Sequence, residues 1–321
     1  MPRRATSAIS PFPQAVGVLG FALILATACL GRGQELLARL PEVVFAPSAH
    51  SVPAYTVEHV EHEHGRQYDT WDLQVLPDGL LYHSYLAGTK EPRFAMQWFH
   101  ETNAGWLADA ALGGRMGLLR YGTRDPLRPE GWQIDVEGGA LPRINLEEDM
   151  DLMAVDFRVG SPLTYARGPY RMKLGYYHLS SHLGDELMLE HPGVPRINFS
   201  RDSIIWGHSY YWTDEIRLYG EAAWAFHTDG GTRPWEFQFG VEYRPSRPTG
   251  LRPTPFLAVN GHLREELDFG GNLSIQTGWL WRGERGHLFR IGMAYYTGMS
   301  DQFEFFDRYE DKVGLGIWYD Y

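Results

Sequence analysis

The sequence predicts an all-β protein: an antiparallel transmembrane β-barrel of about twelve strands, preceded by a signal peptide and a short extension. Three observations lead to this prediction. Apolar and polar residues alternate through a dozen segments between residues 94 and 321, an export signal precedes them, and the chain ends in an alternating aromatic segment. Barrel strands have this pattern because one face of each strand contacts lipid and the other lines the lumen.

The N-terminus has the order of a secretory signal peptide. Arg3 and Arg4 precede an apolar stretch from Ala15 to Ala28, which is too short to favour a retained anchor helix. The motif Ala26-Thr27-Ala28 fits the small-x-small cleavage rule, so we expect residues 1–28 to be removed. Cys29 would then come first and could be acylated, but ordinary cleavage is preferred because alanine stands where lipoprotein signals carry leucine.

Composition excludes several classes of protein. The net charge of −11, from 40 acidic and 29 basic residues, argues against a nucleic-acid partner. The single cysteine excludes a disulfide framework and a thiolate metal cluster. After the first 30 residues no apolar run is long enough for a membrane-spanning helix. A mean hydropathy of −0.34 with 14% aromatic residues suits a barrel, whose polar lumen face offsets its apolar lipid face.

Residues 29–93 are expected to form a periplasmic extension or linker. Pro41, Pro47 and Pro53 break regular structure there. The histidines and glutamates of residues 57–64 are of the type that binds zinc or copper. A solvated acidic linker is the preferred interpretation, because no second ligand cluster would fix a coordination geometry.

The alternating segments have the length of membrane strands. In one of them Trp235, Phe237 and Val241 share one face, and Glu236 and Glu242 share the other. These segments approach the roughly 9–11 residues that a tilted strand needs to cross a bilayer, and a soluble, exported β-sandwich is the runner-up. The candidates cover residues 94–101, 106–120, 131–138, 149–160, 169–182, 199–212, 214–227, 234–245, 254–264, 271–282, 287–297 and 311–321.

The C-terminal segment is typical of the closing strand of an outer-membrane barrel. Val313, Leu315, Ile317, Tyr319 and Tyr321 occupy one face, and the chain ends on an aromatic residue. The assembly machinery of the outer membrane recognises such a strand. The predicted location is therefore the bacterial outer membrane, and the predicted partners are membrane lipids and that machinery, with no nucleic acid.

Charged residues on the other face of the strands predict the state of the lumen. Their mixed signs indicate a lumen filled by paired side chains rather than an open, charge-selective pore. The residues expected to point inward are Arg158, Arg171, Lys173, Arg217, Glu236, Glu242, Arg244, Arg282 and Arg290.

One strand departs from the apolar pattern on its lipid face. Leu174 and Tyr176 mark that face, and continuing the alternation puts His178, Ser180 and His182 on it. Polar groups that face hydrocarbon are costly unless they lie near the interface or bond to one another. With the barrel's N-terminus in the periplasm, odd-numbered strands run outward, so the end of this fifth strand should lie near the outer leaflet.

The spacing of these residues suggests nucleophilic catalysis. Alternate residues of a strand lie about 6.6–7 Å apart at Cα, so the His178 imidazole can act as base for the Ser180 hydroxyl. Simple antiparallel register places Asp202 opposite His178 and Asn198 opposite His182, and either could orient the imidazole. The oxyanion would need backbone amides near residues 181–184, or a calcium ion.

Asp185 and Glu186 are the candidate ligands of that calcium ion. Apart from this Ca²⁺, the sequence indicates no cofactor. The chemistry leaves the substrate open between a phospholipid and lipid A, because the grooves that select an acyl chain have no linear pattern.

A His-x-Ser pair facing lipid near the outer end of a barrel strand resembles the active site of the outer-membrane phospholipase A family, and lipid A deacylases place the pair similarly. The resemblance implies that His178 is the general base, Ser180 the nucleophile, and Asn198 or Asp202 the orienting residue. The residues that follow differ, because the phospholipases continue with Asn-Gly and this chain continues with Ser181-His182.

The strings HLSSHLGDE and LLYHSYLAGTKEPRF more closely resemble a family of bacterial outer-membrane proteins classed only as a domain of unknown function. That resemblance implies a barrel and no assigned activity. Two functions therefore remain open: a lipid esterase or deacylase with a lipid-facing His-Ser site, and a non-enzymatic structural or transport (porin-like) barrel in which His178 and Ser180 are ordinary residues of the interfacial girdle.

Overall fold

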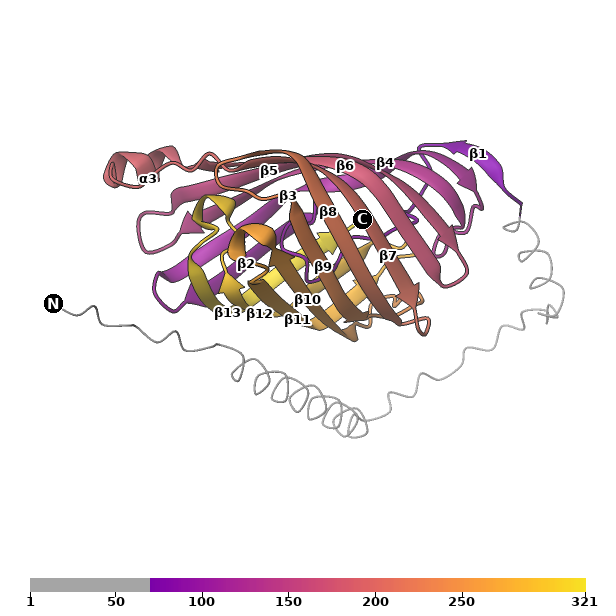
Figure 1. The fold of residues 1–321 in the computed structure, drawn as a ribbon. Coiled ribbons are helices and arrows are strands. Elements are labelled where there is room, and N and C mark those ends of the chain that lie inside the picture. The colour runs from indigo at the N-terminus through magenta and orange to yellow at the C-terminus, as the bar shows by residue number, and fades with distance from the viewer. Residues whose placement is uncertain (1–69) are drawn as a thin grey trace, which may run out of the picture. The chain divides into compact units, whose positions relative to one another are not determined.

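The computed structural model describes residues 70–321, which form a closed antiparallel barrel of twelve strands with one additional short strand (Figure 1). The extra strand, β1 (Asp72–Val75), pairs with the end of β3. The barrel strands are β2 (Phe94–Glu101), β3 (Gly105–Gly122), β4 (Gly131–Asn145), β5 (Asp151–Arg167), β6 (Tyr170–Leu183), β7 (Ser200–Tyr211), β8 (Ile216–Asp229), β9 (Trp235–Tyr243), β10 (Thr254–Arg264), β11 (Gly271–Arg282), β12 (Leu288–Met299) and β13 (Tyr309–Asp320). The predicted signal peptide and the cluster at residues 57–64 lie outside the described residues.

Pairing between the last strand and the first closes the sheet. β13 runs antiparallel to β2 from Lys312 opposite Glu101 to Tyr319 opposite Phe94. Every other pairing within the barrel joins strands that are consecutive in the chain. A closed sheet has no edge, so its backbone N–H and C=O groups can bond within the wall, as a hydrocarbon surrounding requires. The prediction of a twelve-stranded antiparallel barrel is confirmed.

The predicted bounds of three strands, 94–101, 254–264 and 271–282, agree with the structure. The third candidate was ended too early, because β4 continues from residue 138 to Asn145. Its continuation contains Gly139 and Pro142, which suppress the sequence pattern of a strand. The ladder between β3 and β4 is interrupted between the pairs Leu112–Ala140 and Asp109–Arg143. Pro142 lies in this interruption, where the sheet does not need the N–H group that proline lacks.

Three short helical segments lie in the connections between strands. They are α3 (Asp185–Glu190), η2 (Glu265–Leu267) and η3 (Phe303–Phe305). Within residues 70–321, no helix has the length and apolar character needed to cross a bilayer.

The outward face of the barrel is apolar and aromatic. Large exposed side chains occur on strand after strand around the wall. They include Trp98, Trp106, Trp132, Leu174, Trp206, Trp224, Trp235, Phe239, Trp279, Met293 and Leu315. An exposed apolar surface that encircles a barrel is the lipid-contacting face of a transmembrane protein.

The inward face is charged, as predicted. All nine residues expected to point into the lumen are buried, each with at most 9% of its surface exposed. Many are paired across strands: Arg158 with Glu137, Arg217 with Glu242, and Arg290 with Asp320. Burying a charge without its partner is strongly unfavourable, so these pairs are needed wherever the lumen excludes water.

The chain segment before β2 lies inside the barrel. We call Leu80–Arg93 the plug segment. Tyr82, Tyr85 and Leu86 are each at most 1% exposed. The Leu86 amide donates a hydrogen bond to a carboxylate oxygen of Glu242 at 2.7 Å, which ties the segment to β9. The sequence analysis assigned these residues to the extension and did not foresee that they occupy the lumen.

The wall of the lumen holds the plug segment through its backbone and tyrosines. Arg217 of β8 donates to the carbonyl oxygen of His83 at 2.9 Å, and Arg290 of β12 donates to that of Leu86 at 3.3 Å. The Tyr85 hydroxyl donates to Glu221 of β8 at 2.9 Å. The plug segment thus satisfies wall charges and fills the lumen at the level of these strands.

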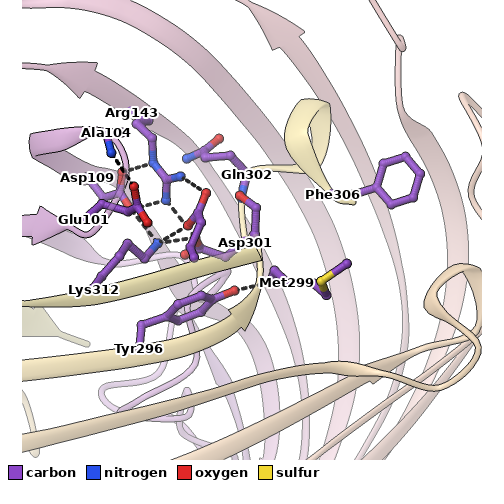
Figure 2. A network of polar contacts seen from close by, with 12 residues as sticks. Glu101, Ala104, Asp109, Arg143, Tyr296, Met299, Asp301, Gln302, Phe306 and Lys312 are labelled. Atoms are coloured by element: carbon purple, nitrogen blue, oxygen red, sulfur yellow. Dashed lines mark hydrogen bonds and ion pairs between the residues drawn. The ribbon is translucent and has the colours of Figure 1, made fainter. Parts of the chain in front are cut away.

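A second polar network lies near the end of the barrel at which β2 ends and β13 begins (Figure 2). Arg143 contacts Asp109 at 2.7 Å, Asp301 at 2.8 Å and Glu310 at 2.6 Å. Lys312 reaches Asp301 at 2.6 Å and Glu310 at 2.9 Å. Three carboxylates therefore share two cations, and all five residues are buried. These contacts tie β3 and β4 to the connection between β12 and β13.

Replacing Arg143 by methionine should destabilise the barrel by about 3–5 kcal/mol, because it leaves buried carboxylates without their main counter-charge. Urea unfolding in detergent micelles, followed by tryptophan fluorescence, measures the change. Arg285→Met is the control, since Arg285 and its partner Asp78 are 68% and 66% exposed. It should change stability by no more than about 0.5 kcal/mol. Equal unfolding midpoints for the two variants would show that the buried network contributes little.

The purified barrel should show no large, steady conductance in planar lipid bilayers, because the plug segment and the paired wall charges occupy the lumen. Single-channel recording at neutral pH is the measurement. Tyr85→Ala serves as a comparison, since it removes a ring that stacks on Tyr219 at 3.9 Å between centroids. Stable openings of porin size in the wild-type protein would contradict a filled lumen.

Candidate functional site

The predicted site lies on the outward face of two neighbouring strands. β6 carries His178 and Ser180, and β7 carries Asp202. The pairing places His178 opposite Asp202 and Ser180 opposite Ser200, which is the register predicted from the sequence. On β6 the residues that alternate with this face, Tyr177 and Leu179, are buried in the lumen at 1% and 2% exposure.

The barrel has one end at which β2 begins and β13 ends. The site lies toward the opposite end. Phe94 begins β2 and pairs beside Tyr319 near the end of β13, so both termini of the barrel lie at one end. β6 starts at that end and reaches His178 and Ser180 in its last residues before α3. The site therefore lies toward one end of the barrel wall rather than at its middle.

Asp202 holds the imidazole by a hydrogen bond. The distance from His178 Nδ1 to Asp202 Oδ1 is 2.9 Å. A carboxylate that accepts from Nδ1 fixes the ring orientation and the tautomer in which Nε2 carries the free lone pair. The side chains of His178 and Asp202 are 35% and 21% exposed, so the pair can be reached from outside the barrel.

Two further residues contact the same carboxylate. The Tyr176 hydroxyl donates to Asp202 Oδ1 at 2.6 Å, and His227 Nδ1 of β8 lies 3.4 Å from Oδ2. A β-bulge between Asp202 and Ser203 shifts the register with β8 and brings His227 opposite Asp202. The sequence analysis missed His227, because a bulge displaces one residue without changing the apolar pattern. Tyr176 is two positions before His178 on the same face and could have been named from the alternation.

The nucleophile candidate is present but not engaged. Within residues 70–321, no hydrogen bond joins the Ser180 hydroxyl to His178, whose imidazole bonds to Asp202. Ser180 is half-buried and shares the outward face with His178. The next residue, Ser181, points inward, where its hydroxyl donates to Asp156 and accepts from the Glu304 amide at 3.0 Å. Ser181 is therefore part of the lumen network.

Two of the amides considered for an oxyanion hole are already used. The Ser181 amide donates to the carbonyl oxygen of Phe199 at 2.9 Å, and the Gly184 amide donates to that of Met153 at 2.9 Å. Neither N–H group is free to bind a developing oxyanion in this conformation.

The remaining candidates are not brought to the imidazole. Asn198 is exposed before β7, and its backbone N–H donates to Glu304 at 2.9 Å. Asp185 and Glu186 are exposed in the first turn of α3. Among the described residues, the group close enough to share an ion consists of Glu148, Glu190 and His191, all exposed. The charge of Asp151 raises the pKa of Glu190 in that group. Of the two alternatives for the orienting residue, the structure brings Asp202 to His178.

Several solved outer-membrane proteins are similar to this chain at low sequence identity. The outer membrane phospholipase (OMPLA) dimer of Salmonella typhi with bound calcium is 11% identical, with a TM-score of 0.51 over 71% of this chain and 90% of that one. The outer membrane phospholipase A of Escherichia coli is 10% identical over 71% and 92%, with a TM-score of 0.47. The KdgM porin is 9% identical over 71% and 99%, with a TM-score of 0.40.

At this identity the likeness to the Salmonella phospholipase establishes the barrel fold alone. The curated proteins compared with the sequence include no match. Residues 49–321 match a family described as "Protein of unknown function (DUF1207)". That match spans the described barrel and most of the sequence, and the protein therefore belongs to this family.

Proposed function

We propose that the protein is an outer-membrane lipid esterase in which Ser180 is the nucleophile, His178 the general base and Asp202 the residue that orients the imidazole. The observation that carries this proposal is the 2.9 Å hydrogen bond between His178 and Asp202 on the lipid-facing wall, with Ser180 two residues further on the same face. Lipid esters would reach these side chains from the membrane without entering the lumen.

The chemistry follows from the orientation of the ring. With Nδ1 bonded to Asp202, Nε2 of His178 can take the Ser180 proton as the hydroxyl oxygen attacks the ester carbonyl carbon. The protonated imidazole then gives that proton to the departing alcohol, and water releases the fatty acid from the acyl-serine. A rotation of the Ser180 or His178 side chain is needed first, and catalytic hydrogen bonds commonly tighten only when substrate is bound.

The surroundings support a lipid substrate. The outward face on either side of the site is apolar, with Leu174 and Ile204 each 46% exposed. Location in the bacterial outer membrane, removal of residues 1–28, and recognition of β13 by the assembly machinery belong to the same proposal. A calcium ion near Asp185 and Glu186, acting on the oxyanion, also remains a prediction, as does the choice between phospholipid and lipid A.

The second candidate is a structural barrel without enzyme activity. It is favoured by the saturation of Asp202, whose two oxygens lie within 3.4 Å of Tyr176, His178 and His227. In such a cluster the polar side chains bond to one another, so they can lie in the interfacial girdle at a low cost in free energy, whether or not Ser180 reacts. A porin-like function is disfavoured by the plug segment.

Ser180→Ala should reduce fatty acid release by about a thousandfold or more, because it removes the proposed nucleophile. Asp202→Ala should reduce it by at least about a hundredfold, because the imidazole loses its orientation. The assay uses the purified full-length protein with phospholipid and lipid A in separate mixed micelles, each with calcium and with a chelator.

Ser200→Ala is the matched control, since Ser200 lies opposite Ser180 on the same face without contacting the imidazole. It should keep wild-type activity. If the wild-type protein releases no fatty acid from either lipid, or if Ser180→Ala retains its rate, the esterase proposal is wrong and the structural candidate stands.

A further inference from the structure

A polar cavity of about 300 Å³ opens at the end of the barrel that carries its two termini. It is bounded by the connections after β3, β5 and β7, by the start of β6, by the residue that follows β9, by the end of β11, and by Leu80 and His83 from the plug segment. The His178–Asp202 pair lies toward the opposite end of the barrel and on its outside. The cavity is therefore separate from the proposed esterase site.

Three buried arginines line this cavity: Arg171, Arg244 and Arg282, which are 6%, 2% and 6% exposed. Their hydrogen-bond partners are all neutral. Arg171 donates to the carbonyl oxygens of Gly168 and Tyr170. Among the described residues, no carboxylate lies within 4.0 Å of any of the three guanidinium groups.

Two of these guanidinium groups also have unused donors. Arg244 donates from Nη2 to the Tyr211 hydroxyl at 2.7 Å, and Arg282 donates to the carbonyl oxygens of Pro245 and Leu127 at 3.1 and 3.3 Å. The Nε atoms of both arginines are buried and have no hydrogen-bond partner within the part of the chain that the structure describes.

Most other buried arginines of the lumen have a carboxylate partner, although Arg120, among the described residues, bonds only to Gln133 and to the carbonyl oxygens of Asp78 and Gly79. Arg115, Arg143, Arg158, Arg201, Arg217 and Arg290 each contact a carboxylate within 4.0 Å. A buried, unpaired guanidinium is strongly unfavourable. Three together, in one cavity, indicate that the missing counter-charge is supplied from outside the chain.

Acidic groups near the cavity mouth have other partners. Asp214 contacts Arg128 at 2.5 Å, and the hydrogen bond and charge of Arg128 hold the pKa of Asp214 below its usual value. Asp125 accepts the amides of Leu127 and Arg128, both at 2.8 Å. The cavity floor therefore keeps its positive charge.

The pKa of His83 is affected by the same positive charges. Burial, followed by the charges of Arg244, Arg282, Arg217 and Arg171, holds the pKa of His83 well below its usual value. His83 is therefore neutral at physiological pH, where it can donate or accept a hydrogen bond, and the charge of the cavity comes from the arginines alone.

We propose that this cavity binds a phosphoryl oxyanion, held by Arg171, Arg244 and Arg282. Guanidinium forks match the oxygen geometry of phosphate and give charge-assisted hydrogen bonds. The volume is at the lower end of the roughly 300–1,000 Å³ typical of small-molecule sites, so the ligand is a phosphate group with a small substituent. Two sources share this chemistry: a soluble phosphate or phosphate monoester, and the phosphodiester headgroup of a lipid.

The experiment is calorimetric titration of the purified full chain in a neutral detergent with inorganic phosphate, glycerol 3-phosphate and glycerophosphoglycerol, each in a separate run. Saturable binding of the first two compounds assigns the site to a soluble phosphate, and saturable binding of the diester alone assigns it to a lipid headgroup. R244Q and R282Q should each weaken binding by about tenfold or more. The affinity of R244K should lie between that of R244Q and that of the wild type.

R285Q is the matched control, since this exposed arginine lies in the connection after β11 and does not line the cavity. It should bind like the wild type. Thermal unfolding in detergent distinguishes lost binding from misfolding. Without ligand, R244Q should be at least as stable as the wild type. The compound that binds should raise the Tm of the wild type and of R285Q, but not that of R244Q. No saturable binding of any of the three compounds, or equal affinities of R244Q, R282Q and R285Q, would overturn the proposal.

Discussion

The pairing of β13 with β2 is the constraint on which the rest of the structure depends. Lipid offers no hydrogen-bond partner to a backbone group, so a sheet in a membrane must have no free edge. Closure fixes the register of every strand, and the register assigns each side chain to lipid or lumen. Ser180 faces outward and Ser181 bonds to Asp156 inside the barrel for this reason alone. Alternate positions of a strand face lipid and lumen in turn. Whether a side chain can act on lipid or on the lumen is therefore decided first by its position in this alternation.

The closed wall also creates the requirement that the lumen be filled. Charged side chains occupy it in pairs, and the plug segment supplies further partners through backbone groups that carry no net charge. This arrangement leaves the balance of charge uneven along the axis. Near Arg143 carboxylates outnumber cations, whereas around Arg244 and Arg282 buried cations lack carboxylates. The two ends of one lumen consequently differ in what they can bind.

The sequence predicted the strands, their faces and the meeting of His178 with Asp202, because a period of two determines facing and a hairpin determines register. It ended β4 too early at residue 138, where glycine and proline mask a strand that pairing with β5 sustains. It missed His227, which a bulge delivers, and the plug segment, whose place depends on contacts with residues over a hundred positions away. Patterns of neighbouring residues do not predict contacts between residues so far apart in the sequence. The catalytic roles of His178, Ser180, Asp202 and Asn198, and the metal-binding roles of Asp185 and Glu186, stay predictions.

The position of the plug segment in the chain bears on how the barrel assembles. It immediately precedes β2, yet its partners Glu221, Glu242 and Arg290 belong to strands that are synthesised much later. Contacts between residues so distant in sequence form late in folding, after the loop between them has been ordered. Once β13 has paired with β2, the closed wall bars lateral entry, and the segment can reach the lumen only through an end of the barrel. Closure of the wall and placement of the plug segment are therefore coupled steps of folding.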